Sequence, residues 1–170
     1  KIQSHGANSS LYIVEDTQLN EIFMLKQIDK NKIKESSKYF DEVRNVKDIE
    51  NKNIVKINYA TYDDDNIYIS MPYYKNGSLQ DILQERNLTV REIVKYSLEI
   101  LSGLYYIHKK NILHCDIKPS NILIDDYGCA VLADFGSAIN INHSGVGKLK
   151  NVYYKHIAPE QCSSSRVDVR

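Results

Sequence analysis

A polar segment stands between two hydrophobic pairs at positions 114–121, where the chain reads His-Cys-Asp-Ile-Lys-Pro-Ser-Asn. An Ile-Leu pair flanks it on each side, so the segment is predicted to form a loop held between packed segments. Asp116, Lys118 and Asn121 place a carboxylate, an ammonium and an amide on this one loop. A carboxylate can orient and deprotonate a hydroxyl, an ammonium can neutralise a phosphate, and an amide can hold a divalent metal. The loop therefore indicates phosphoryl-transfer chemistry.

The composition narrows the class of protein. A chain of 170 residues has the size of one ordinary domain and can bury a sizeable core. Its formal net charge is zero and its acids and bases are interspersed, which argues against binding nucleic acid or anionic lipid through bulk charge. No apolar run approaches the ~20 residues of a membrane span, and no signal peptide opens the chain. Because the chain does not begin with Met, it is interpreted as part of a larger polypeptide.

The cysteines indicate the compartment. Cys115, Cys129 and Cys162 are odd in number and lack the paired spacing of a metal site. Disulfides are found mainly in oxidising compartments, so this pattern favours a reduced, intracellular and cytoplasmic setting.

Residues 1–30 are predicted to form strands, because short β-branched or aromatic runs at 11–14 and 22–25 are separated by polar turns. The segment 4–10 before them contains Gly6 and, taken alone, is an ordinary hairpin. Lys26 follows the second run, where a lone lysine is most often a solvated edge residue.

An amphipathic stripe predicts a helix over residues 35–49, with apolar residues at spacings of three: Phe40, Val43, Val46 and Ile49. Glu42 lies beside this stripe, where its carboxylate can face the sheet. A further strand is predicted at 66–71, after an acidic turn at 63–65 that is interpreted as a solvated hairpin tip in preference to a cation site.

The second half is predicted to contain helices before the polar loop and a hairpin after it. Ser78 is the predicted N-cap of a first helix. A long helix with a wide buried face is predicted over 89–110, from a stripe made of Ile93, Val94, Ser97, Leu98, Leu101, Leu104 and Ile107. Apolar runs at 122–124 and 131–133 predict a β-hairpin, and polar composition predicts a mobile loop over 137–157.

These motifs, in this order, resemble those of eukaryotic-type protein kinases. That family has a Lys at the end of a strand, a Glu on the next helix, the polar loop, Asp-Phe-Gly and Ala-Pro-Glu. The chain has these motifs at Lys26, Glu42, 114–121, 134–136 and 158–160. The resemblance covers essentially the whole chain. The family's loop usually begins His-Arg-Asp, whereas Cys115 stands in place of the Arg here.

The resemblance implies an α+β, bilobal protein kinase-like fold. Residues 1–71 would form an antiparallel β N-lobe with one helix (αC in kinases), residues 72–75 the hinge, and residues 76–170 a mainly helical C-lobe. Because the chain stops soon after Glu160, this C-lobe is expected to be truncated after the activation segment, without the later helices. The apolar face of residues 93–107 would then lose its cover, so the isolated chain is expected to be unstable or inactive.

The resemblance also assigns roles to individual residues. Asp116 would position and deprotonate the attacking hydroxyl, and Lys118 would steady the γ-phosphate of ATP. Lys26, paired with Glu42, would hold the α and β phosphates. Mg²⁺ would be bound by Asn121 and Asp134. The residues expected to contact the nucleotide are Ile2, Gly6, Leu11, Met24, Lys26, Met71, Pro72, Tyr74 and Leu123.

Several positions depart from the family's pattern. Of the three glycines in the family's phosphate-binding hairpin only Gly6 remains, with Ser4 and Ser9 in place of the others. Met24 stands where kinases most often carry Ala above the adenine ring, and it is long enough to narrow the pocket. Cys115 removes the cation that pairs with a phosphorylated activation loop, so activity is predicted to depend little on loop phosphorylation.

The implied function is transfer of the γ-phosphoryl group of Mg-ATP to Ser or Thr hydroxyls of a protein substrate, because Lys118 follows Asp116 by two residues as in Ser/Thr kinases. One alternative is a pseudokinase that binds ATP or acts as a scaffold. The missing glycines and Met24 favour it, whereas the intact Lys, Glu, Asp and Asn residues argue against it. Another is a small-molecule kinase, such as one acting on aminoglycosides or choline, which the Lys-Pro-x-Asn loop and the Ala-Pro-Glu ending disfavour.

Overall fold

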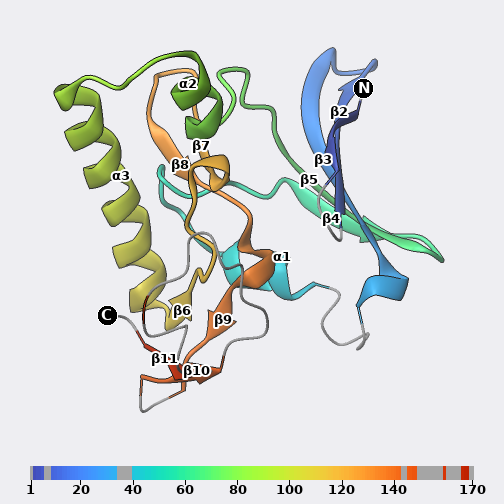
Figure 1. Cartoon of the computed structure of the whole chain (residues 1–170). Coiled ribbons are helices and arrows are strands. Elements are labelled where there is room, and N and C mark those ends of the chain that lie inside the picture. The colour runs from blue at the N-terminus through green and yellow to red at the C-terminus, as the bar shows by residue number, and fades with distance from the viewer. Residues whose placement is uncertain are drawn as a thin grey trace. The chain divides into compact units, whose positions relative to one another are not determined.

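A computed structural model describes residues 2–5, 9–33, 40–142, 145–148, 159 and 166–168 of the chain (Figure 1). The chain divides into two compact units. The first comprises Lys1–Ile49 and Val55–Tyr74, and the second comprises Glu50–Ile54 and Lys75–Arg170.

The first unit is built on a five-stranded antiparallel sheet with the strand order β1-β2-β3-β5-β4. Its strands are β1 (Ile2–His5), β2 (Ser9–Asp16), β3 (Glu21–Asp29), β4 (Tyr59–Tyr62) and β5 (Asn66–Pro72), and a 3-10 turn, η1 (Lys30–Lys32), follows β3. The predicted strands at 11–14, 22–25 and 66–71 are confirmed as parts of β2, β3 and β5.

The acidic turn between β4 and β5 is a hairpin tip, as predicted. The Asp63 carboxylate accepts the N–H groups of Asp65 and Asn66 at 2.9 and 2.7 Å and the hydroxyl of Tyr68 at 2.7 Å. Asp63, Asp64 and Asp65 are all exposed. Neighbouring donors and solvent therefore stabilise the turn, and its geometry requires no cation.

The first unit also contains α1, which covers Asp41–Val46. Residues 34–39, where the predicted helix began, lie outside the described residues. The predicted end at residue 49 is wrong, because α1 stops at Val46 and a turn follows. The Ile49 N–H donates to the Val46 carbonyl at 3.0 Å, and this tighter i to i−3 bond closes a turn in place of another helical turn.

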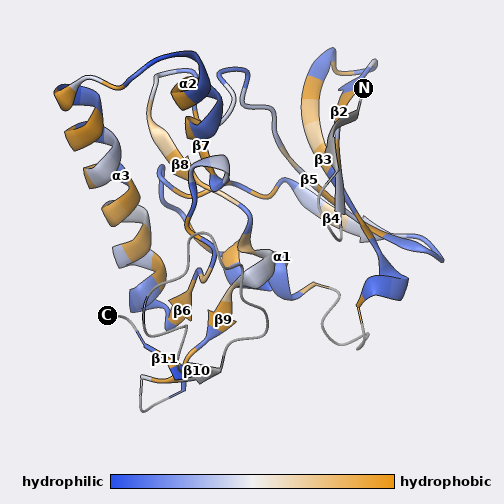
Figure 2. Cartoon of the chain, in the orientation of Figure 1, coloured by the Kyte–Doolittle hydropathy of each residue, from blue (hydrophilic) through white to orange (hydrophobic). Residues whose placement is uncertain are grey.

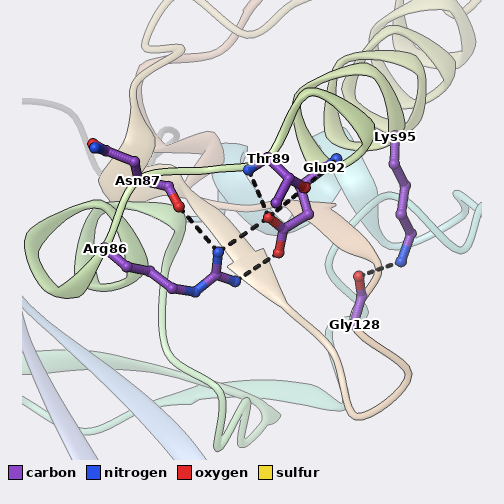
Figure 3. A network of polar contacts seen from close by, with 6 residues as sticks. All are labelled: Arg86, Asn87, Thr89, Glu92, Lys95 and Gly128. Carbon is purple, nitrogen blue, oxygen red and sulfur yellow. Dashed lines mark hydrogen bonds and ion pairs between the residues drawn. The ribbon is translucent and has the colours of Figure 1, made fainter.

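Two helices open the second unit, α2 (Leu79–Glu85) and α3 (Val90–Lys109), and each begins with a capping box. Ser78 and Asp81 form the first box, which confirms the predicted N-cap. Thr89 and Glu92 form the second, and the Arg86 guanidinium binds both oxygens of Glu92 at 2.6 and 3.0 Å (Figure 3). The predicted long helix is thus confirmed. In the described part of the chain, neither α3 nor any other helix has the length and apolar character of a membrane span.

One face of α3 packs against two short strands, β6 (Ile112–Leu113) and β8 (Ala130–Leu132). Tyr96, Gly103 and Ile107 are the buried residues of this face. Strand β8 pairs with β7 (Ile122–Ile124) in the predicted hairpin. The Lys95 ammonium reaches the turn of this hairpin and donates to the Gly128 carbonyl at 2.6 Å (Figure 3).

The opposite face of α3 is apolar and exposed. Between 50% and 77% of the surface is exposed at Val90, Ile93, Val94, Leu98, Leu101 and Tyr105. The prediction of a wide buried face is therefore wrong for Ile93, Val94, Leu98 and Leu101. Hydrophobic residues recur along the whole helix (Figure 2), and periodicity does not tell which of two apolar faces packs inside the unit. The expectation that apolar residues of this helix lack cover agrees with their exposure.

The rest of the second unit contains further short elements: strand β9 (Ile139–Asn140), which pairs with β6, strands β10 (Gly147–Lys148) and β11 (Arg166–Val167), which pair with each other, and the 3-10 turns η3 (Pro119–Asn121) and η4 (Phe135–Ser137). Within the described part of the loop predicted over 137–157, β9 and β10 are strands. Strand β9 forms because Ile139 pairs with Leu113 and both side chains are buried, which outweighs the polar composition around them.

Residues 50–54 belong to the second unit although they precede two strands of the first. Asn53, which is 1% exposed, donates from its side-chain amide to the Ala130 carbonyl at 2.9 Å. Its own carbonyl accepts the Leu132 N–H at 2.8 Å. A Cβ added to Gly103 would lie 2.9 Å from the same Asn53 oxygen, so α3 passes close to this segment. Asn53 thus lies between β8 and α3.

Candidate active site

Two predicted catalytic residues, Asp116 and Lys118, and one predicted metal ligand, Asn121, meet at one oxygen atom in the second unit. Asp116 is 8% exposed, and its Oδ2 accepts the Lys118 ammonium at 2.7 Å and the Asn121 amide at 2.9 Å. The Asn121 amide also donates to the Asp116 backbone carbonyl at 2.9 Å. Asn121 itself lies in η3, whose Pro119 stands at the first turn. These bonds hold the carboxylate in one orientation, next to a cation whose side chain is only 25% exposed.

His114 positions this loop, a role that the sequence-based reasoning did not assign to it. The residue is 2% exposed, and its Nδ1 accepts the Asp116 backbone N–H at 3.3 Å. Its Nε2 lies 2.9 Å from the Ala133 carbonyl, and the ring packs on Phe135 with the centroids 4.7 Å apart. Burial lowers the pKa of His114, so the ring is neutral and Nε2 carries the donated proton. The available signal was a histidine placed directly between a buried pair and a polar loop.

Ala133 brings Asp134 to the same loop. The Ala133 N–H donates to the Asn121 carbonyl at 2.9 Å, while the Ala133 carbonyl faces His114. Asp134 follows with a left-handed backbone (φ 61°), and its carboxylate accepts the Gly136 N–H at 3.4 Å. Phe135, 1% exposed, fixes the next position in the core. Asp134 and Asn121, the two predicted metal ligands, therefore lie on segments that a backbone hydrogen bond joins.

The donor set can be tested against a divalent cation. Among the described residues, no three His, Cys, Asp or Glu side chains gather as a metal site. Asn121 and Asp134 nonetheless offer a carbonyl and a carboxylate, which are the oxygen ligands that Mg²⁺ prefers. The Asn121 nitrogen is turned toward Asp116, so its oxygen is the atom with ligand chemistry. A pair of this kind fits Mg²⁺, which commonly binds one or two protein ligands together with substrate phosphates.

In the first unit, the structure brings Lys26 and Glu42 together. Both carboxylate oxygens of Glu42 accept the Lys26 ammonium at 2.8 Å, and the two side chains are 9% and 10% exposed. Strand β3 supplies the lysine and α1 the glutamate. Glu42 offsets the cost of burying the ammonium and holds it in a defined position on the sheet.

Four of the predicted nucleotide residues in β2, β3 and β5 share one face of the sheet: Leu11, Met24, Lys26 and Met71. Leu11 lies directly opposite Lys26, and Met71 lies directly opposite Met24, so the alternation of side chains places all four on that face. Ile13, on the other side of Met24, belongs to the same row and was not predicted. It could have been predicted from its position two residues after Leu11, because side chains two apart on a strand lie on the same face.

The remaining predicted nucleotide residues are more scattered. Pro72 ends β5 opposite Phe23, and Tyr74 is the last residue of the first unit. Leu123 lies in β7 of the second unit, half-buried, in an isolated bridge with Ser78. Of the two other predicted nucleotide residues, Ile2 lies in β1 opposite Tyr12, and Gly6 lies outside the described residues. The predicted Ala158-Pro159-Glu160 motif is described only at Pro159.

The fold and the two groups of residues together define a class of protein. An antiparallel sheet with a Lys–Glu pair, followed by a unit with an Asp-Lys-Asn loop and an Asp-Phe-Gly turn, is the organisation of a kinase. The family model described as "Protein kinase domain" matches residues 4–169. The chain belongs to the protein kinase domain family and has its α+β fold.

Proteins of similar sequence are also named as protein kinases. The chain is 33% identical over 167 residues to Mitogen-activated protein kinase kinase kinase YODA of Arabidopsis thaliana, which covers 94% of this chain and 19% of that protein. It is 37% identical over 148 residues to 3-phosphoinositide-dependent protein kinase B of Dictyostelium discoideum, covering 82% and 16%. It is 33% identical over 135 residues to Serine/threonine-protein kinase CLA4 of Candida albicans, covering 77% and 14%. The chain thus spans less than a fifth of each relative.

Proposed function

We propose that this domain transfers the γ-phosphoryl group of Mg-ATP to Ser or Thr hydroxyls of a protein substrate. The observation that carries the proposal is the buried Asp116 carboxylate held by Lys118 and Asn121. Membership of the protein kinase family supports the same reaction class.

Asp116 acts on the attacking hydroxyl. Since Oδ2 binds Lys118 and Asn121, Oδ1 is the oxygen assigned to accept the hydroxyl proton. The hydroxyl oxygen then bonds to the γ-phosphorus, the bond from phosphorus to the β–γ bridging oxygen breaks, and ADP leaves.

The cations balance the phosphate charge. Lys118 lies 2.7 Å from Asp116, so its ammonium is next to the attacking oxygen and is assigned to the γ-phosphate. Lys26, fixed by Glu42, is assigned to the α and β phosphates. Asn121 and Asp134 are assigned as ligands of Mg²⁺, which when bound would neutralise phosphate oxygens.

Two features support protein Ser/Thr specificity. Lys118 follows Asp116 by two residues, the pattern of Ser/Thr kinases. One relative, CLA4, is named a serine/threonine-protein kinase.

The wider setting is also proposed. Residues 1–71 would form the N-lobe, residues 72–75 the hinge and residues 76–170 the C-lobe. The small share of each relative that is covered supports a longer polypeptide. Cys115 and Cys129 are free thiols, which supports an intracellular compartment.

The decisive experiment replaces the proposed base. In Asp116→Asn, kcat with ATP and a generic basic protein should fall by about 10²–10⁴-fold, because the general base is lost. The dissociation constant for Mg-ATP should stay close to the wild-type value. Asp126→Asn, the same change at an exposed turn that pairs with Lys75, is the matched control and should keep full activity. Full turnover by Asp116→Asn would refute the assignment.

A pseudokinase is a second candidate, favoured by one observation. Met24 and Met71 stand opposite each other on the face that carries Lys26, where two long side chains crowd the expected nucleotide surface. Equilibrium binding of Mg-ATP together with a turnover assay separates the candidates. Binding without turnover would favour the pseudokinase, and turnover would exclude it.

A further inference from the structure

Cys115 is part of a small apolar cluster in the second unit. Leu113, Ile139 and Val167 are buried together, and Cys115 and Ile141 pack against them. These five residues, hereafter the Cys115 cluster, come from β6, the catalytic loop, β9 with its following residue, and β11. The cluster thus joins the residue next to Asp116 to chain segments that follow Asp134.

We propose that Cys115 is a positioning residue for Asp116 and that it acts through apolar packing against Ile141 and its neighbours. The inference rests on the proposed function of Asp116. It adds that the orientation of the base depends on a cluster outside the catalytic groups.

The backbone of Cys115 supports this role. Its φ is 63°, in the left-handed region that L residues rarely adopt and that persists only where the surroundings hold it. The Cys115 thiol lies 3.6 Å from the Leu113 carbonyl, which it can donate to, and its half-buried side chain packs against the cluster. The next peptide bond leads directly to Asp116, so the packing of this one side chain sets the direction in which the base leaves the loop.

The far side of the cluster is tightly packed. Strand β9 reaches it through the pairing of Ile139 with Leu113, and β10 lies against it at Gly147. A Cβ on Gly147 would stand 2.6 Å from Ile139 Cδ1 and 3.1 Å from Ile141 Cγ2. Gly147 pairs with Val167, which closes the cluster. Strand β10 therefore packs directly against Ile139 and Ile141 and leaves no space for a side chain at residue 147.

The chemistry of the cluster excludes a reactive role for the thiol. Burial raises the pKa of Cys115 to about 11, so the nucleophilic thiolate is scarce at neutral pH. The contacts within the cluster are apolar, so they require neither a charged partner nor a phosphate group. Cys115 therefore acts through the apolar packing of its side chain.

Two substitutions approach the cluster from opposite sides. Cys115→Gly removes the side chain while glycine tolerates the positive φ, so packing is lost without added strain. Ile141→Ala removes packing at a residue remote from the catalytic loop in sequence. Each should lower kcat by about tenfold or more while KM for ATP changes by less than about twofold, because small displacements of a catalytic group cost rate and not binding. The double variant should lose no more than the larger single loss, since the two act on one unit.

A labelling measurement tests the packing itself. The full chain is treated with iodoacetamide, and the modification of each cysteine is followed by peptide mass spectrometry. Ile141→Ala should label Cys115 about tenfold faster than wild type and leave Cys129, in the turn between β7 and β8, unchanged. Cys129→Ala is the control for activity and should keep the wild-type kcat. If Cys115→Gly fails to fold, Cys115→Ala, which keeps the Cβ, replaces it.

The outcomes separate the two proposals. Faster labelling with lower kcat and constant KM supports the positioning role. Faster labelling with unchanged kcat overturns it, and unchanged labelling in Ile141→Ala shows that the cluster does not enclose the thiol. If wild type itself transfers no phosphate, the proposed function fails and the positioning role fails with it, while labelling still reports whether the cluster is packed.

Discussion

At the residue scale, His114 joins the candidate active-site loop to the segment around Asp134 through one neutral ring. It bonds to the Asp116 backbone and to Ala133, and it packs on Phe135. A protonated ring could no longer accept the Asp116 N–H, so the geometry depends on the charge state of the imidazole.

This dependence predicts a loss of stability in mild acid. Burial lowers the pKa of His114 below its ordinary value of 6.5, so near that pH the unfolded chain binds a proton that the folded chain does not. The contribution of His114 is complete above pH 6.5 and is lost progressively as the pH falls toward the folded pKa. Urea unfolding at pH 8, 6.5 and 5 measures it, with His114→Gln expected to show a shallower pH dependence than wild type.

His108 provides the comparison. Burial also lowers its pKa, but its place on α3 is only partly buried, so His108→Gln should change the pH dependence less than His114→Gln. Equal slopes for wild type and His114→Gln would contradict the assignment of a neutral ring.

The Lys26–Glu42 pair predicts a coupled effect on stability. Glu42→Gln removes the carboxylate charge that lies 2.8 Å from a buried ammonium and should lower the free energy of unfolding by about 3 kcal/mol. In a double-mutant cycle, Lys26→Met with Glu42→Gln should cost less than the sum of the single changes. The matched control is Arg44→Met, which breaks an exposed pair with Asp41 on the same helix and should cost under ~0.5 kcal/mol. Additive costs in the cycle would show that the pair contributes no coupling.

At the element scale, the close approach of α3 to Asn53 decides the effect of a helix substitution. Gly103→Ala should gain about 1 kcal/mol of helix propensity. The added Cβ, however, would stand 2.9 Å from the Asn53 backbone oxygen, which cannot move without breaking its bond to Leu132. The net result should be a lower melting temperature, corresponding to about 1–3 kcal/mol of overpacking.

Ser102→Ala separates propensity from packing, because Ser102 is the exposed neighbour on the same helix. It should leave the melting temperature unchanged or slightly raised. A stabilised Gly103→Ala would mean that α3 can shift away from Asn53.

Elements with strong local signals could be predicted from the sequence. Short apolar runs located parts of β2, β3 and β5, and a polar residue before an apolar run located the cap at Ser78. Elements that depend on distant partners could not. Strand β9 depends on the pairing of Ile139 with Leu113, and the sequence around residue 139 has no local pattern that predicts a strand.

For the candidate site, chemistry-bearing residues were recognisable and supporting residues were not. Asp116, Lys118 and Asn121 stand close together in sequence, so their meeting on one loop could be expected. The hydrogen bonds from His114 and Asn121 to Ala133 join residues far apart in the chain. On the Ala133 side they use backbone atoms, so the identity of residue 133 gives no indication of them. The sequence therefore identifies the candidate catalytic residues more easily than the residues that position them.

At the scale of the whole molecule, the exposed face of α3 predicts self-association. Val94, Leu98 and Leu101 are 52–62% exposed and follow one another along the helix. Contiguous apolar surface of this kind promotes aggregation. The isolated 170-residue chain should therefore show oligomers by light scattering at about 50 µM.

A charged version of this face is the test. Replacing Val94, Leu98 and Leu101 by Lys, Glu and Lys should reduce the scattering without lowering the melting temperature, because more than half of the surface of each residue is already exposed. The same three positions of α3 also offer a size-matched apolar control, with Leu at Val94 and Met at Leu98 and Leu101, which should scatter like wild type. A wild-type chain that stays monomeric would contradict the prediction.

The assignment of residues 50–54 to the second unit has a consequence for dissecting the protein. The chain passes from one unit to the other at Ile49–Glu50, Ile54–Val55 and Tyr74–Lys75. A fragment that begins at Lys75 would lack Asn53, and the Leu132 N–H and Ala130 carbonyl of β8 would lose their partners. No single cut therefore yields two intact halves. The smallest separable second unit must keep residues 50–54, supplied as a grafted segment or as a complementing peptide.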